Sequence, residues 1–237
     1  MDLGAIREAL PFIVIAGIFV FFFAISRGRK RHAQRIATVA TELGLHFEPE
    51  VAPETADVLK PSRFRGPTVA SNYLSGSRGR SEVEIINFRV SSTGGSGGST
   101  RTTTVGAIPY QGPRFAVRPG DPREIESKSR ARENFRQAAE ALPFLGTMMQ
   151  GSSAVERVEI PGDDEFSTSW MVTGEDDSAI REAVTPALQS FCKAHRDLEL
   201  QSNGNRFLVF HQSEHLRPDE YAGFVEVLRE LDAATRA

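Results

Sequence analysis

Two histidines near the end of the chain have a spacing that could hold a metal ion. The segment "HQSEH", His211–His215, matches the H-x-x-E-H pattern of one class of zinc proteases. That chemistry needs both histidines on one helix face, a glutamate as base and a third ligand far downstream. Here His211 ends a strand-like run, Pro218 opens a helix only afterwards, and few residues follow. The pattern therefore favours a strand end and a polar turn, and we predict no metal and no cofactor.

Two further kinds of motif contain residue types used in catalysis. "GGSGG", Gly94–Gly98, matches G-x-S-x-G, but the β-prone "STRTTTV" follows it where a nucleophile elbow needs a helix. The same loop lacks the Gly-Lys-Ser/Thr of a P-loop. Carboxylates gather in "GDDEF" and "GEDD" without the alternating ligands of an EF-hand, and Asp177 or Ser178 is better suited to cap the next helix. We predict no catalytic residue.

The helices that would surround these motifs are indicated by apolar residues at helical spacing. Four are expected: His32–Gly44, Asp121–Leu142, Ser178–His195, and a last helix that Pro218 opens. Pro186 must bend or split the third of these helices. The last helix is expected to bury one stripe of residues, Tyr221, Phe224, Val225, Leu228 and Leu231.

The expected strands are short and separated by turn residues. They are Thr68–Leu74, Ser81–Val90, Arg101–Ile108, Pro113–Pro119, "VERVEI", "EFSTSWMVTG", "DLELQS" and "RFLVFH". The last two flank "NGN", which is typical of a hairpin. The order of elements predicts an α+β fold, with a mainly antiparallel sheet and helices on one face. A subdomain boundary, if there are two subdomains, would fall near residues 143–153.

The N-terminal region predicts a membrane anchor. Ala9–Ser26 contains no charged residue, and as a helix at ~1.5 Å per residue it would span roughly 27 Å, close to the ~30 Å hydrocarbon core. A cleaved signal peptide has a positive start and a small-residue cleavage site, and neither is present. We therefore expect residues 1–8 to be a short extracytoplasmic N-terminus and residues 9–26 an uncleaved transmembrane helix.

A basic run follows the apolar segment directly. It consists of Arg27, Arg29, Lys30, Arg31 and Arg35. Lys and Arg just after a span mark the cytoplasmic flank, so the run places the rest of the chain in the cytoplasm. It could also contact anionic lipid headgroups, at roughly 1 kcal/mol per charge, or serve only to set the topology. We predict a basic juxtamembrane helix over residues 27–45 and a cytoplasmic α+β domain over 46–237.

The charge behind the basic run is acidic. Residues 36–237 hold 22 Lys and Arg against 29 Asp and Glu, a net charge of -7. Such a domain is a poor candidate for nucleic-acid binding, which needs a cationic surface. The single cysteine, Cys192, cannot form an internal disulfide, and a reducing compartment fits. We expect Cys192 to be a buried helix residue and Trp170 to lie in the core.

The order of several segments resembles a known group of proteins. The segments, after a membrane span and a basic stretch, are "ELGLHF", "SRFRG", "YLSGSRGRSEVEIINF", a Gly/Ser loop, "PRFAVRP", "FSTSWMVTG", "IREAVTPAL" and "NRFLVF". In this respect the chain is similar to uncharacterised bacterial single-pass membrane-anchored proteins with a domain of unknown function. The resemblance implies one anchored bacterial module and transfers no catalytic residue.

These observations predict a location more sharply than an activity. We expect a single-pass protein of the bacterial cytoplasmic membrane, whose cytoplasmic domain is a protein- or membrane-surface interaction module. The predicted partners are the lipid bilayer through residues 9–26, anionic headgroups and an unknown protein, with no nucleic acid. The alternative is a membrane-associated enzyme of unknown reaction that acts at the cytoplasmic face.

Overall fold

The chain folds around one antiparallel sheet with helices packed on it, an α+β fold as predicted. The computed structural model describes residues 27–28, 30–64, 66–91, 100–120, 156–211 and 215–236. The predicted transmembrane helix 9–26, the predicted helix Asp121–Leu142 and the segment 143–153 lie outside the described residues. Within the described ranges, no helix has the length and apolar character needed to cross a membrane.

The sheet has nine strands among the described residues, in the order β1-β2-β3-β4-β9-β8-β5-β7-β6. Every neighbouring pair is antiparallel. The strands are β1 (His46–Glu48), β2 (Thr68–Arg78), β3 (Ser81–Ser91), β4 (Thr100–Pro109), β5 (Phe115–Pro119), β6 (Glu156–Arg157), β7 (Trp170–Gly174), β8 (Leu198–Ser202) and β9 (Arg206–His211). Because β5 lies between β8 and β7, strands from both sides of segment 143–153 share this sheet.

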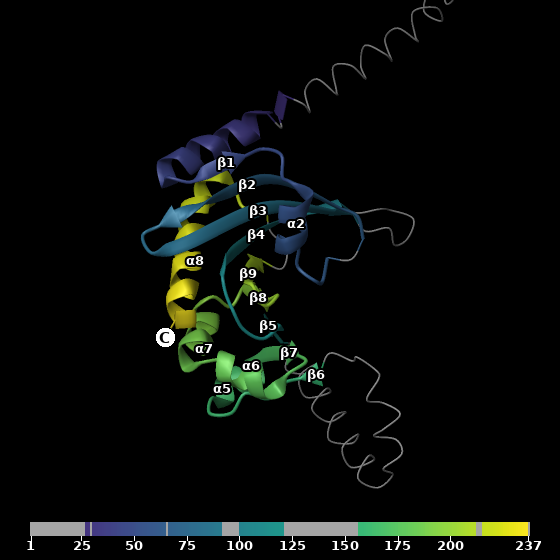
Figure 1. The fold of residues 1–237 in the computed structure, drawn as a ribbon, viewed down its shortest axis with the longest axis vertical. Coiled ribbons are helices and arrows are strands. Elements are labelled where there is room, and N and C mark those ends of the chain that lie inside the picture. Colours follow the sequence, from purple (N-terminus) through teal and green to yellow (C-terminus); the bar gives the residue numbers. More distant parts are fainter. Residues whose placement is uncertain are drawn as a thin grey trace, which may run out of the picture.

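The helices lie at two ends of the sheet and on both of its faces (Figure 1). They are residues 30–43, α2 (Pro53–Leu59), α5 (Asp164–Ser169), α6 (Asp177–Ala183), α7 (Pro186–Ala194), the 3-10 turn η1 (Pro218–Glu220) and α8 (Tyr221–Arg236). Helix 30–43 crosses the end that holds β1 and β2, whereas α5, α6 and α7 lie at the opposite end (Figure 1). The yellow helix α8 runs between these two groups.

The larger core lies between the sheet and the helices 30–43, α6, α7 and α8. All five residues of the predicted stripe on α8 are buried, which confirms that prediction. Helix α8 approaches β4 closely at Gly106, where an added Cβ would lie 2.7 Å from Phe224 and 2.8 Å from Leu228. Glycine at this position therefore sets the distance between helix and sheet.

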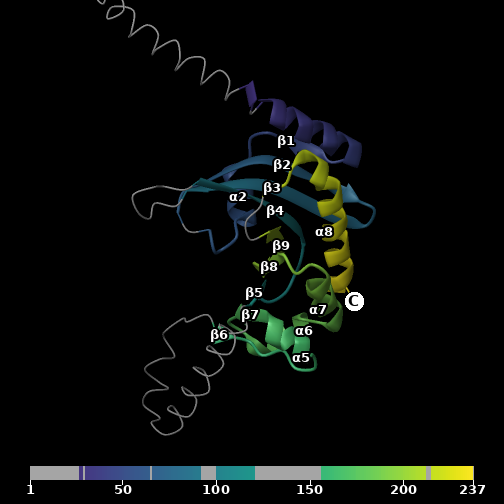
Figure 2. The ribbon, with the colours of Figure 1, turned by 180° about the vertical axis from the view of Figure 1, so that it is seen from behind.

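A second core covers the opposite face of the sheet, so the prediction of helices on one face only is wrong. Helix α2 and the segment after it place Leu59 and Phe64 against Ile86, Phe88 and Phe210. Strands β3, β4 and β9 are apolar on both faces, and each face needs its own cover. Figures 1 and 2 show α2 and α8 on different sides of the sheet.

The strand predicted over "EFSTSWMVTG" is only half right. Residues Asp164–Ser169 form helix α5, and the strand β7 begins at Trp170. The Asp163 carboxylate accepts a 2.8 Å hydrogen bond from the Phe166 amide and so caps the helix. The predicted strand "VERVEI" is reduced to the two residues of β6. Trp170 itself is buried, as predicted.

Other local predictions are confirmed. Pro186 ends one helix and opens the next, dividing the predicted helix into α6 and α7. The hairpin β8–β9 turns at "NGN", where Gly204 adopts φ +95°. Helix 30–43 ends at Gly44, with φ +71°, as a C′ glycine does. Cys192 is buried on α7, and burial raises the pKa of its thiol to about 12.

Candidate functional site

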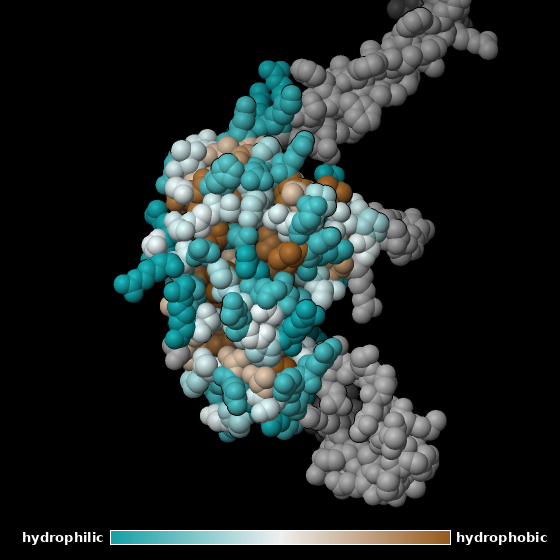
Figure 3. Space-filling view, viewed as in Figure 1, coloured by the Kyte–Doolittle hydropathy of each residue, from teal (hydrophilic) through white to brown (hydrophobic). Residues whose placement is uncertain are grey.

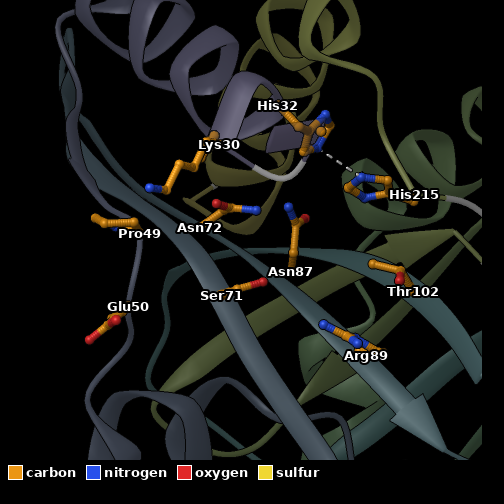
Figure 4. A pocket seen from close by; sticks show the side chains of 12 residues that line it. Lys30, His32, Pro49, Glu50, Ser71, Asn72, Asn87, Arg89, Thr102 and His215 are labelled. Carbon is orange, nitrogen blue, oxygen red and sulfur yellow. Dashed lines mark hydrogen bonds between the residues drawn. The ribbon is translucent and has the colours of Figure 1, made fainter. Parts of the chain in front are cut away.

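A cleft of about 890 Å³, lined mainly by polar and charged residues, opens between the start of helix 30–43 and the strands β2, β3 and β4 (Figure 4). Its side chains come from elements far apart in the sequence. They include Lys30 and His32 of the helix, Ser71 and Asn72 of β2, Asn87 and Arg89 of β3, Thr102 of β4, and His215 between β9 and η1. Glu50 is the one carboxylate that lines it among the described residues. The volume is that of a small-molecule site.

A change of polarity along one sheet face creates the cleft. On β3, Val83 and Ile85 are buried against the helices, and the next two residues on that face are Asn87 and Arg89. Across the strands, Asn87 pairs with Ser71 of β2 and with Thr104 of β4. The face is therefore apolar where helices cover it and polar where it opens.

A buried hydrogen-bond network forms the floor of the cleft. Thr104 Oγ1 donates to Asn87 Oδ1 at 2.8 Å, and Asn87 Nδ2 donates to the Tyr221 hydroxyl at 3.0 Å. The Leu216 amide donates to Thr104 Oγ1 at 3.1 Å. Asn87 is 1% exposed and Thr104 is fully buried. Because each polar group has a partner, the network fixes both the strands and the start of the His215 segment.

Two histidines meet at the edge of this network. The Nε2 atoms of His32 and His215 lie 3.1 Å apart, and His215 Nδ1 lies 3.5 Å from Thr104 Oγ1 (Figure 4). One ring must donate and the other accept, so the contact requires at least one neutral imidazole. Burial and the neighbouring His32 lower the pKa of His215, against an opposing effect of Glu220. In the free cleft the lowered pKa favours the neutral form of the His215 ring.

The backbone of β2 is bent where it borders the cleft. The β2–β3 register shifts between Ser71 and Leu74, and Asn72 within this bulge adopts φ +54°. It is the one described non-glycine residue with a positive φ. The Asn72 amide donates to the Pro49 carbonyl at 3.2 Å, which holds this conformation. Bulges of this kind redirect side chains, and here Asn72 lies between the helix and β3 (Figure 4).

Positive charge in the cleft is not neutralised by the surrounding described residues. Lys30 and Arg89 are both exposed. Neither forms an ion pair with another residue in the described part of the chain. Glu50, the carboxylate of the lining, is also exposed, and interactions between exposed charges are screened by the solvent.

The basic run meets the cleft at one residue, Lys30. Arg27, Arg31 and Arg35 are exposed on the same helix and do not line the cleft, and Arg29 lies outside the described residues. The sequence therefore identified Lys30 for its charge and missed His32, Arg89 and the rest of the lining. The alternation in "VEIINFR", with Asn87 and Arg89 in phase with Val83 and Ile85, is the signal that could have revealed it.

The two histidines of "HQSEH" do not lie on one helix. His211 ends β9 and pairs with Asp197 at 3.0 Å, whereas His215 faces His32. Among the described residues, no group of three or more His, Cys, Asp or Glu could hold a metal ion. The loop Gly94–Gly98 lies outside the described residues.

The clustered carboxylates have structural roles at helix starts. Asp163 caps α5 and pairs with Lys193, which lowers the pKa of the Asp163 carboxyl. Asp176 caps α6 by accepting from the Ala179 amide at 3.0 Å, so the prediction of Asp177 or Ser178 as the cap is wrong by one or two residues.

Comparison of the chain with family models, with curated proteins and with solved structures finds no match in any of the three. The cleft is therefore interpreted from its own chemistry, and the resemblance to bacterial anchored proteins stays a prediction.

Proposed function

We propose that this is a single-pass membrane-anchored protein whose α+β domain is a cytoplasmic interaction module at the membrane surface. The observation that carries the proposal is the order of the first 35 residues. An uncharged stretch of membrane-spanning length, Ala9–Ser26, is followed at once by five basic residues and then by an acidic folded domain. This arrangement puts the positive charge where the chain would leave the bilayer.

The described part of the basic helix supports contact with lipid headgroups. Lys30, Arg31 and Arg35 are exposed, while Ile36 and Ala40 on the same helix are buried against the domain. None of these three cations forms an ion pair with another described residue. Exposed cations near an anionic bilayer each contribute roughly 1 kcal/mol to binding.

The surface favours a membrane-surface role over a large apolar docking interface. The face seen in Figure 3 is mainly hydrophilic, with small apolar patches scattered over it. Among the described residues, the large hydrophobic side chains with high exposure are Val58 and Val69. Single exposed apolar residues are ordinary for a soluble surface, whereas stable docking faces are larger.

The experiment is membrane partition of the full chain with two charges placed in the apolar stretch. Ile18→Asp with Phe21→Asp should move the protein from a carbonate-resistant membrane fraction to the soluble fraction, since each aspartate near a helix centre costs roughly 3 kcal/mol. Ile18→Leu with Phe21→Leu is the matched control and should stay in the membrane. Equal partition of the two variants would contradict the anchor.

An enzyme at the cytoplasmic face is the second candidate, and one observation favours it. His215 lines an open cleft with its pKa lowered by burial and by His32, so a neutral imidazole is available as a general base at neutral pH. Turnover of a phosphate ester that is lost in His215→Gln, with ligand binding retained, would favour this candidate. Binding without turnover would favour the interaction module.

A further inference from the structure

We propose that the cleft between helix 30–43 and strands β2–β4 binds a phosphate group of an ester, with Lys30 and Arg89 as its charged contacts. The phosphate would be carried either by a membrane lipid headgroup or by a soluble phosphoester. The lipid source rests on the proposed function. The anion site itself rests only on residues of the cleft.

The charge of the cleft is the first ground for this inference. Two cations without ion pairs among the described residues, Lys30 and Arg89, line it together with two imidazoles and a single carboxylate, Glu50. This positive charge lies in a chain whose residues 36–237 have a net charge of -7, so it is local and selects an anion. An arginine guanidinium matches phosphate oxygens with two parallel N–H donors, and a lysine adds a point charge.

Neutral donors complete the site. The lining includes the hydroxyl groups of Ser71 and Thr102 and the side-chain amide of Asn72. Thr102 pairs directly with Arg89 across β3 and β4, so both side chains lie on the same face of the sheet. Asn72 is held in the bulge by its left-handed backbone, a conformation that asparagine adopts more readily than most other residues.

The shape and rigidity of the cleft fit an ester rather than a bare ion. Its volume, about 890 Å³, leaves room for the carbon-bearing part of a ligand beyond one phosphate group. The floor is preorganised because Asn87 and Thr104 satisfy one another and are almost fully buried. Binding therefore orders few floor side chains, which reduces its entropic cost.

The position of the cleft brings a bilayer within reach. Lys30 follows Ser26, the last residue of the predicted span, by four positions, or about 6 Å along a helix. The cleft lies at this N-terminal end of helix 30–43 (Figure 4). If the anchor spans the membrane, the cleft opens close to the headgroup layer, where phosphodiesters are concentrated.

The site is tested by titrating the full-length protein, in a neutral detergent at pH 6, with inorganic phosphate. Saturable binding is expected by calorimetry, at least tenfold weaker in Arg89→Ala. Arg101→Ala is the matched control, because Arg101 is also exposed on the neighbouring strand but points to the opposite face from Thr102. The affinity of Arg101→Ala for phosphate should stay within twofold of that of the unmodified protein. Absent binding, or equal losses in both variants, would overturn the proposal.

A photo-crosslinking residue at Thr102, with one at Arg101 as control, identifies the source of the phosphate. The protein is reconstituted in vesicles of phosphatidylglycerol and phosphatidylcholine. A lipid adduct at position 102 and not at 101 supports a headgroup. Arg89-dependent phosphate binding without a lipid adduct supports a soluble phosphoester and leaves the site standing. The detergent titration needs no bilayer. A negative titration therefore contradicts the anion site, whereas a negative membrane-partition experiment contradicts the anchor.

Discussion

At the scale of single residues, the contact between His32 and His215 has the largest effect on the chemistry of the cleft. It joins side chains 183 positions apart and requires one neutral ring. No spacing within the chain predicts such a pair, since only the packing of helix 30–43 on the sheet creates it. The histidine pattern visible in the sequence, "HQSEH", contains His211 and His215, whereas the structure places His215 beside His32 and His211 beside Asp197.

The histidine pair predicts that anion binding strengthens as the pH falls. The pKa of His215 lies below its usual value in the free cleft because of burial and of His32, and a bound anion would raise it by favouring the charged ring. Binding then takes up a proton, so affinity increases as the pH falls through this window. The other charged groups facing this space are Lys30, Arg89, Glu50 and, on η1, Glu220.

Sulfate is the suitable probe for this prediction, because its charge is constant between pH 5.5 and 7.5. A gain of about three- to tenfold is expected over this range, as a shift of up to about one pKa unit gives. In His215→Gln the profile should flatten. An affinity that is constant or decreases on acidification in the unmodified protein would contradict the proposed role of the pair.

At the scale of elements, the sequence correctly predicted the helices and turns that are determined by residues close together in the chain. Pro186, "NGN" and the stripe on α8 act within a few residues, and each gave the right element. Helix α2 was missed because it has seven residues and buries only Leu59. Helix α5 was missed because the residues of "EFSTSW" favour a strand. In the structure Asp163 caps this helix, and Phe166 stacks on Trp170.

The close approach of α8 to β4 predicts opposite effects for two glycine substitutions. Gly106→Ala forces a Cβ against Phe224 and Leu228 and should lower the free energy of unfolding by about 1–3 kcal/mol. Gly223→Ala on α8 meets nothing within 4 Å and should raise it by about 0.5–1 kcal/mol. Thermal or urea unfolding, followed by the fluorescence of the buried Trp170, measures both. A stabilising Gly106→Ala would show that the helix is not held at this distance.

In the segment after α2, substitutions of the two partners of one ion pair should have unequal effects on stability. Arg63 pairs with Glu199 and lies 4.5 Å above the Phe210 ring, with 35% of its side chain exposed against 8% for Glu199. Arg63→Met leaves a buried carboxylate unpaired and should cost about 1–3 kcal/mol of stability, less than a fully buried pair. Glu199→Gln should cost less, since Arg63 keeps access to water.

The exposed pair Arg196–Glu165 provides the control for this measurement. Both side chains are more than half exposed, so Arg196→Met should change stability by at most about 1 kcal/mol. Equal losses for Arg63→Met and Arg196→Met in urea unfolding would mean that Glu199 is not effectively buried.

At the scale of the whole molecule, one feature can be predicted from the sequence and another depends on the fold. The charge contrast between the basic run and the acidic domain lies in contiguous stretches of the chain, so the sequence alone predicts it. The residues of the cleft are far apart along the chain, because they come from helix 30–43, three strands and the segment before η1. The strand register places Ser71 and Asn87 of its lining in one row with the buried Thr104.

The orientation of the molecule gives a prediction that uses its single cysteine. Cys192 is 1% exposed, so a membrane-impermeant maleimide applied to intact cells reports only cysteines that are introduced. Asp2→Cys should be labelled from outside, whereas Ala222→Cys, exposed on α8, should be labelled only after lysis. Replacing Arg27, Arg29, Lys30, Arg31 and Arg35 by Gln removes the topological signal and should give a mixed population, with position 222 labelled in part of the intact cells. Labelling of Ala222→Cys in intact cells with the basic run unchanged would refute the cytoplasmic placement, and would leave the anion site to be judged by its own titration.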